Sequence, residues 1–493
     1  MNRIIYVVLS LIAVCGLSAC SGYLDVEPES VYTELIIGES KESGETRYTT
    51  KQDMDLLLAN MYTGFRSTIS NLYNLDLPMM TDVRSDNAYS GSIEGWALEL
   101  DNFKVTPANT VTSRSWKEHY AMIGKANVII DNVDAIADPA MTEELKETYK
   151  AEAKILRGMM YFNLVRMYGD VPLVLKETPD ITSDNVDEIY PLLYPYREES
   201  SRVYQQIVSD LESGALYGPV SYASGDKFKL TRAFASGLLA KVYATVPEKD
   251  WQKVKDYCDD VMEVGYRLAD NYDDLWKAGS KNTVESIFEI SYSNDAPNWG
   301  YDMFLGTAWR KFCTPTQDLE EAFMQEGENG DIVRRNASIA VSGCTWENWW
   351  PSDSYRFMNK LRTKTNSWIV MRLADIILLK AEALIELNDL TGAATLVNRV
   401  RGRVGLPSLT ASDMASKESM RLAVERERRL ELAFEGHRWY DLVRTGRVMS
   451  VIRSWKDHNG EQALAHIQEW MILLPVPQTE RDSNPNLTQN EGY

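Results

Sequence analysis

The sequence predicts a mostly α-helical protein, in which helix-turn-helix pairs form a scaffold for long irregular loops. Three observations support this prediction. A long amphipathic helix between Thr142 and Gly169 carries apolar residues at spacings of three and four. Further segments of helical period follow in pairs with short connections. Three loops, at roughly 70–110, 290–320 and 340–368, are rich in aromatic residues, asparagine and aspartate.

The composition is that of a globular protein. Of the 493 residues, 44% are hydrophobic and 25% are charged, which indicates neither a disordered chain nor a multispan membrane protein. The formal net charge of −20 argues against a nucleic-acid partner, because phosphate groups bind to basic surfaces. The same charge fits a neutral or cationic ligand better than a polyanion. Tryptophan is unusually frequent, with 13 residues spread along the chain.

The N-terminus predicts a signal peptide over residues 1–19. Its apolar run, from Ile4 to Leu17, is too short to span a bilayer comfortably. The run ends in "LSAC", which resembles a bacterial lipobox, where small residues precede a cysteine that accepts diacylglycerol. The alternative is an ordinary secretory signal that happens to contain a cysteine. We favour lipidation of Cys20, with residues 20–24 as the lipidated tether.

Three other cysteines remain in the mature chain, at positions 258, 313 and 344. An odd number at scattered spacing indicates neither a disulfide framework nor a metal site. One bridge is open to them, with Cys313 and Cys344 as the nearer pair, but we expect buried free thiols. The sequence also lacks the phosphate-loop, nucleophile-elbow and H-E-x-x-H motifs, and its four histidines are scattered.

The predicted helices follow in order along the chain. Apolar residues have helical spacing from Gln52 to Arg66 and again over residues 115–134. Thr142 is the expected N-cap of the clearest helix, which stops at Gly169. The remaining predicted helices are at about 197–213, 229–245, 250–264, 371–387, 391–402 and 418–436. The pair at 371–402, with a turn at Asn388-Asp389, has the pattern of a tetratricopeptide unit.

Six segments, taken in order, resemble one known family. They are "CSGYLDVEP", "WKEHYAMIGKANVIIDNV", "AEAKILRGMMYFNLVRMYGDVPLV", "MRLADIILLKAEALIEL", "ERRLELAFEGHRWYDLVRTGR" and "LLPVPQTERDSNPNLTQNEGY". Each segment alone is a weak indication, but all six in this order are specific. Nearly end to end, the chain resembles the SusD/RagB lipoproteins, which are surface ligand-binding partners of TonB-dependent transporters in Bacteroidetes-type bacteria.

The resemblance implies a single SusD-like domain with four tetratricopeptide-like helix pairs, divided into an N-terminal half at 25–245 and a C-terminal half at 246–493. It implies a protein without catalytic activity that is held at the outer membrane by its lipid anchor and faces outward. Such a protein captures oligosaccharides or polysaccharides, or in some members peptides, and acts as a lid on a SusC-like TonB-dependent transporter. No cofactor is implied, and a structural calcium ion is left open. A surface glycoside hydrolase is the more distant alternative.

Sugar capture needs aromatic faces for stacking and polar side chains that bind hydroxyl groups. In the family the resemblance places the ligand face on an N-terminal loop and on loops ahead of the final helix pairs. The matching positions in this chain are Asp82, Arg84, Asp86, Asn87, Tyr89, Trp96, Trp299, Tyr301, Trp309, Trp346, Trp349 and Trp350. Two alternatives remain open: Trp96 and Trp299 pack within their loops, and Asp82 and Arg84 anchor theirs through an ion pair.

Four other tryptophans are expected in the core, because they lie in regular or family-motif segments; they are Trp116, Trp368, Trp439 and Trp470.

Residues 427–446, "ERRLELAFEGHRWYDLVRTG", gather charged side chains around apolar ones and raise the question of a catalytic site. We favour a structural role, with Leu430, Phe434 and Trp439 buried and Gly436 ending or kinking the helix. His437 is then a partly exposed polar residue. Helix spacing predicts three ion pairs, namely Glu425–Arg429, Arg428–Glu431 and Glu435–Arg438.

Overall fold

The computed structural model describes residues 47–66, 72–178, 185–304 and 312–493. Thr49–Tyr493 form one compact unit. Two of the predicted functional residues, Cys20 and Trp309, lie outside the described residues. Within the described ranges, no helix has the length and apolar character needed to cross a membrane.

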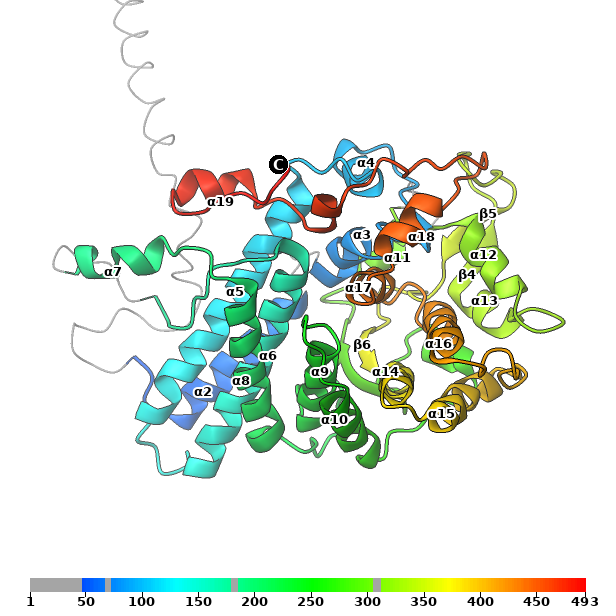
Figure 1. Ribbon diagram of the computed structural model, residues 1–493. Helices are drawn as coiled ribbons and strands as arrows, with labels where there is room; N and C mark the ends of the chain where they lie inside the picture. Colours follow the sequence, from blue (N-terminus) through cyan, green and yellow to red (C-terminus); the bar gives the residue numbers. More distant parts are fainter. Residues whose placement is uncertain (1–46, 67–71, 179–184, 305–311) are drawn as a thin grey trace, which may run out of the picture. The chain divides into compact units, whose positions relative to one another are not determined.

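The fold is mostly helical, as predicted, and most of the long helices pack on a neighbour in the sequence. The first six are α2 (Lys51–Thr63), α5 (Thr110–Asn132), α6 (Glu143–Tyr168), α8 (Ser200–Tyr217), α9 (Arg232–Tyr243) and α10 (Trp251–Glu263). Helix α5 packs on α6, α6 on α8, α8 on α9, and α9 on α10. Because α9 and α10 lie on either side of residues 245/246, the two predicted halves share one continuous helical scaffold (Figure 1).

Helix α6 illustrates why these segments are helical. The Thr142 side chain accepts a hydrogen bond from the backbone N–H of Leu145, and the helix ends at Gly169, whose positive φ of 73° suits glycine. The predicted apolar stripe is buried except at Leu145. Nearly all residues from Ala151 to Tyr168 are also buried, because α5 and α8 cover two sides of the helix.

The scaffold continues through the C-terminal half with α14 (Leu373–Glu386), α15 (Leu390–Arg403) and α16 (Lys417–Glu431). Helix α14 packs on α10, and α15 and α16 both pack on α14 around one apolar cluster. The predicted turn is present: Asn388 has a positive φ of 72°, and the Asp389 side chain accepts from the Gly392 N–H to begin α15.

Three short antiparallel strand pairs lie outside the helical scaffold. Strand β1 (Ala88–Tyr89) pairs with β3 (Thr314–Pro315), β2 (Ser286–Ile290) with β6 (Trp368–Arg372), and β4 (Ile339–Ser342) with β5 (Tyr355–Met358). These strands belong to the segments that the sequence predicts as long loops or to their edges.

Short helices make up much of the rest. They are α3 (Leu77–Met80), α4 (Gly95–Asp101), α7 (Val186–Leu193), α11 (Gly300–Phe304), α12 (Gln317–Met324), α13 (Ile332–Ser338), α17 (Arg438–Arg444), α18 (Val448–Ser454) and α19 (Gln478–Ser483). The predicted long loops are therefore chains of short helices and strands. Their elements are too brief for hydrophobic period to reveal them.

Two sequence predictions need correction here. The helix predicted to run to 436 ends at Glu431, and Phe434 and Gly436 both have positive φ, at 62° and 78°. Trp470 is half-buried and packs on the ring of Tyr493 at 4.9 Å, so it is not a core residue. The expectation of free thiols is confirmed, with Cys344 only partly buried.

The predicted core side chains of the 427–446 segment are buried, but its charges pair in an unexpected way. None of the three predicted pairs within the segment forms among the described contacts. Arg428 contacts Asp375 and Asp441, and Arg429 contacts Asp86 and Asp318. These side chains point into the protein, where carboxylates of other elements are closer than those one helical turn away.

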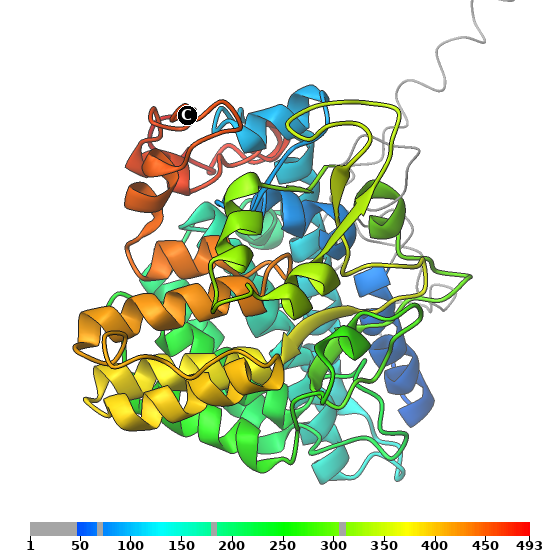
Figure 2. The same ribbon diagram turned by 90° about the vertical axis from the view of Figure 1, so that its right-hand side faces the viewer.

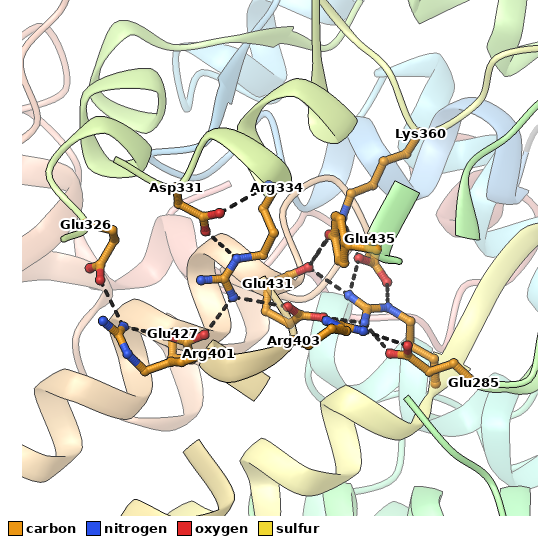
Figure 3. Close-up of polar contacts among 12 residues, drawn as sticks. Glu285, Glu326, Asp331, Arg334, Lys360, Arg401, Arg403, Glu427, Glu431 and Glu435 are labelled. Carbon is orange, nitrogen blue, oxygen red and sulfur yellow. Dashed lines mark hydrogen bonds and ion pairs between the residues drawn. The ribbon is translucent and has the colours of Figure 1, made fainter. Parts of the chain in front are cut away.

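Glu431 lies at the centre of this buried charge network (Figure 3). It accepts from Arg372 Nη1 at 2.6 Å and from Arg334 Nη1 at 3.1 Å, and it also contacts Arg403. Burial acts to raise the pKa of Glu431, but the three guanidinium groups outweigh it and hold the pKa well below its usual value. Glu431 therefore stays ionised and joins α16 to α13, α15 and β6.

The network extends to either side of Glu431. Arg334 also donates to Glu427 at 2.6 Å, and Glu427 in turn accepts from Arg401 at 2.9 Å. On the other side, Glu435 accepts from Arg372 at 2.7 Å and from Lys360 at 2.6 Å. Every charge has an opposite charge in contact, which is the condition for burying ions in a protein interior.

Candidate ligand-binding face

The three aromatic loops meet around Phe312. The Phe312 ring lies 4.9 Å from the ring of Trp96, at the start of α4. Its backbone N–H donates to the carbonyl of Met303 in α11, with N and O 3.3 Å apart. Two residues later the chain enters β3, where Thr314 is in register with Tyr89 of β1. Phe312 and β3 thus bring the first two predicted loops together.

The third loop, between β4 and β5, packs on the same strands. The indole N–H of Trp350 donates to the carbonyl of Pro315 at 2.8 Å, and the ring of Trp349 stacks on Tyr89 with centroids 3.9 Å apart. Helix α4 and this loop both lie at the top of the view in Figures 1 and 2. We call the exposed surface of residues 92–103, 294–304 and 343–354 the candidate face.

The polar residues predicted from the first loop are not on this surface. Asp82, Arg84, Asp86, Asn87 and Tyr89 are each less than 5% exposed, at 0%, 1%, 3%, 0% and 1% respectively. Their side chains contact other parts of the protein, so in this structure they hold the loop and do not face a ligand.

Asp82 and Arg84 do anchor their loop, but to different partners and not to each other. An Asp82 carboxylate oxygen accepts from the Gly436 N–H at 3.0 Å, and burial raises the pKa of Asp82 to about 7. Arg84 donates to the carbonyls of Met471 and Ile472, at 2.6 and 3.1 Å. Its guanidinium lies 4.3 Å from the centroid of the Trp439 ring.

Asp86 and Asn87 are held by the same C-terminal segment. Asp86 accepts two hydrogen bonds from Arg438, and the Asn87 side-chain oxygen accepts from Arg429 at 2.9 Å. Burial acts to raise the pKa of Asp86, but Arg429 and Arg438 outweigh it and lower the pKa well below its usual value. Arginines of the motif at 427–446 thus hold the first loop in place.

Two of the predicted tryptophans in the third loop are also structural. Trp350 is 7% exposed and lies under the Arg356 guanidinium, 4.2 Å from its ring centroid. Trp349 has three nearly parallel rings around it: Tyr89 at 3.9 Å, His458 at 5.0 Å and Trp455 at 5.4 Å. These rings occupy much of the stacking surface that a sugar would need.

The aromatic side chains that remain accessible come from all three loops. Trp299 is 40% exposed, more than any other described tryptophan, and the Lys364 ammonium lies 5.1 Å from its ring centroid. Trp96, Tyr301 and Trp346 are half-buried, the last against the rings of Tyr355 and Phe357. These four offer partly open rings for stacking on the apolar face of a ligand.

Two family models match the chain. The model described as the SusD family matches residues 353–493, and the model described as starch-binding and associating with the outer membrane matches residues 23–244. The chain belongs to the SusD/RagB family.

Relatives and solved structures of SusD type cover most of the chain. SusD-like protein P25 from Formosa agariphila is 24% identical over 100% of this chain and 99% of its own length. The starch-binding protein SusD from Bacteroides thetaiotaomicron is 22% identical over 75% of this chain and 76% of its own. The solved structure of a laminarin-binding SusD-like protein matches with a TM-score of 0.72, at 25% identity, over 90% of this chain and 100% of its own.

His437 of the 427–446 motif lies among charged groups. Its side chain is 13% exposed, which confirms the expectation of a partly exposed residue. Burial and the neighbouring Lys241 lower the pKa of His437 to about 4. A half-buried, neutral imidazole beside a Lys241–Asp375 ion pair fits the structural role of the motif.

Among the described residues, no group of three or more His, Cys, Asp or Glu side chains is placed to hold a metal ion. Several members of the site were missed from sequence. Phe312 and Lys364 lie in two of the predicted aromatic loops but were not singled out there, and Trp455 and His458 lie outside those loops. Only their contacts reveal them.

Proposed function

We propose that this chain is a cell-surface lipoprotein that binds an oligosaccharide or polysaccharide on the candidate face. After capture, it delivers the glycan to a TonB-dependent transporter. Cys20 carries the lipid that holds the protein at the outer membrane, and the protein has no catalytic role of its own. The observation that carries the proposal is the meeting of three aromatic loops around Phe312, with four partly open rings among them.

The relatives support the sugar as ligand. One relative is named for starch and one similar structure for laminarin, and both cover three quarters or more of this chain. Stacking rings with nearby carboxylates and amides match the two surfaces of a pyranose, which has apolar C–H faces and a rim of hydroxyl groups. Trp96, Trp299, Tyr301 and Trp346 are the proposed stacking residues.

The test is calorimetric titration of the protein lacking residues 1–20 with a panel of plant, host and microbial polysaccharides and with a peptide mixture. We expect binding to one class of glycan and no release of reducing sugar. Trp299→Ala and Trp96→Ala should each weaken binding about tenfold, the usual effect of removing a central aromatic contact. Binding of peptides alone would replace the sugar proposal, and release of product would indicate a hydrolase.

The transporter step has a separate test. Immunoprecipitation of the lipidated protein from detergent-solubilised outer membranes should recover a large β-barrel protein, and Cys20→Ala should leave the chain outside the membrane fraction. Recovery of no barrel protein would restrict the proposal to glycan capture.

A further inference from the structure

The candidate face has an uneven charge. The three segments that form it, 92–103, 294–304 and 343–354, carry seven carboxylates and neither lysine nor arginine, and one exposed lysine, Lys104, directly follows the first segment. The carboxylates are Glu94, Glu99, Asp101, Asp295, Asp302, Glu347 and Asp353. Burial raises the pKa of Asp101 to about 8, so this group is mostly neutral at pH 7. The other carboxylates still outnumber Arg310 and Lys311, which lie in the same loop region but outside the described residues.

Three exposed carboxylates of the candidate face stand close to open rings in the sequence. Glu94 precedes Trp96 by two residues, and Glu347 directly follows Trp346. Both carboxylates are exposed, as is Asp295 ahead of Trp299. Three of the four proposed stacking residues, Trp96, Trp299 and Trp346, therefore have an exposed carboxylate close in the sequence.

Two described cations lie over tryptophan rings of these loops, one over the open ring of Trp299 and one over the buried ring of Trp350, and both are already paired. The Lys364 ammonium, over Trp299, lies 2.9 Å from the carboxylate of Asp302. The Arg356 guanidinium, over Trp350, donates to Glu320 at 3.0 Å and to the carbonyl of Ser354 at 2.6 Å. Neither is available to balance a negative charge on a ligand unless it gives up its partner.

We propose that the candidate face selects uncharged glycans and rejects polyanionic ones such as polyuronates and sulfated polysaccharides. This inference rests on the proposed function and specifies its substrate class. A polyanion brings a carboxylate or sulfate to every sugar or two, and each would approach like charges at a distance shorter than the screening length of about 8–10 Å. A neutral sugar instead presents hydroxyl donors, for which exposed carboxylates are strong acceptors.

The experiment compares polymers that differ only in charge. Laminarin, soluble starch and xylan are each prepared with carboxymethyl groups and, as a neutral control of similar size, with hydroxyethyl groups. Binding is measured by affinity electrophoresis and calorimetry at low salt and at about 0.5 M NaCl, where the screening length falls to a few ångströms. We expect the carboxymethyl form to bind at least about tenfold more weakly than the hydroxyethyl form at low salt, with a smaller difference at high salt.

Two variants of equal charge test the location. Glu94→Gln/Asp295→Asn/Glu347→Gln removes three exposed carboxylates of the candidate face, none of which has a side-chain contact among the described interactions. Asp187→Asn/Glu188→Gln/Glu199→Gln removes three exposed ones at α7 and the start of α8. Helix α7 lies at the left of the view in Figure 1, away from α4 at the top. In the first variant, the difference in affinity between the carboxymethyl and the hydroxyethyl polymer should become severalfold smaller. In the second variant, this difference should stay as in the wild type.

Each failure has its own result. Charge selection by this face is wrong, while glycan binding stands, in either of two cases. In the first, the wild-type protein binds carboxymethyl and hydroxyethyl polymers equally at low salt. In the second, both variants reduce the difference in affinity between the two polymers to the same extent. Binding of no polymer in either form would instead overturn the proposed function itself. Preference for the carboxymethyl form, or binding of cationic peptides alone, would also overturn the inference.

Discussion

Arg438 holds Asp86 through two parallel hydrogen bonds, from Nε to Oδ1 at 2.7 Å and from Nη2 to Oδ2 at 2.8 Å. Both side chains are 5% exposed, and their residues lie 352 positions apart in the sequence. This pair connects the loop that leads into β1 with the helix α17. It places a residue predicted to bind ligand in the interior of the protein, in contact with the motif that raised the question of catalysis.

Removing one member of this pair should destabilise the protein strongly. Asp86→Ala leaves the Arg438 guanidinium buried with a weaker partner, Glu425 at 3.2 Å, and we expect a loss of about 3–5 kcal/mol of unfolding free energy. Urea denaturation followed by circular dichroism measures it. In the double variant Asp86→Ala/Arg438→Met the loss should be clearly smaller than the sum of the two single losses; strict additivity would show that the pair does not act as a unit.

Trp299 and Trp350 should separate binding from stability. Trp299→Ala removes a ring that is 40% exposed, so we expect about tenfold weaker glycan binding with a change in unfolding free energy below about 0.5 kcal/mol. Trp350→Ala empties a buried site and removes the bond to Pro315, which should cost about 3–5 kcal/mol. Thermal unfolding and calorimetry on both variants check this, and equal loss of stability in the two would contradict the assignment.

Stability should fall as pH rises through neutrality, partly because of Glu152. This side chain of α6 is 2% exposed and accepts from the Tyr62 hydroxyl at 2.5 Å; burial raises its pKa from 4.5 to about 7. The folded state therefore keeps a proton that the unfolded state loses, so the favourable contribution is present below about pH 4.5 and disappears towards about pH 7.

Glu152→Gln should reduce that pH dependence. We expect the change in unfolding free energy between about pH 5 and pH 8 to decrease by about 2 kcal/mol relative to the wild type. Urea denaturation at several pH values measures it. Glu144→Gln, at an exposed position on the same helix, is the control and should leave the dependence of the unfolding free energy on pH unchanged. If Glu152→Gln keeps the pH dependence of the wild type, the loss of stability at higher pH comes from other buried acids, such as Asp82.

Gly436 should not tolerate a side chain. Its φ is 78°, and a Cβ at this position would come within 3.2 Å of Leu77. Gly436→Ala should therefore cost about 1–2 kcal/mol, from the left-handed backbone and from this contact. Gly402→Ala, in α15 with open space around it, is the matched control and should be neutral or slightly stabilising. Similar losses in both variants would mean that backbone geometry at 436 is not the cause.

The long helices could be predicted from sequence because their information is local. A stripe such as that of α6, with Thr142 before it and Gly169 after it, needs no knowledge of the rest of the chain. The buried face of 427–446 was also predictable, since Leu430, Phe434 and Trp439 have the spacing and size of core residues.

The ion pairs and the burial of the first loop could not be predicted in this way. Helix spacing offers Arg428 a partner one turn away, but the contact that forms, with Asp375, depends on how α14 packs against α16. Likewise nothing near Asp82 in the sequence indicates Gly436 as its partner, 354 positions later. For the same reason aromatic character alone did not distinguish the open ring of Trp299 from the enclosed one of Trp350.

The bonds from Arg84 to Met471 and Ile472 also bear on how the protein folds. They span 387 and 388 positions, so the segment that leads into β1 finds its partners only near the end of the chain. Contacts of such high sequence separation carry a large loop-closure cost and slow the search for the native state. Because synthesis starts at the N-terminus, Arg84 and its neighbours lack these partners until the end of the chain has been made. During that interval the first half of the chain is exposed to aggregation.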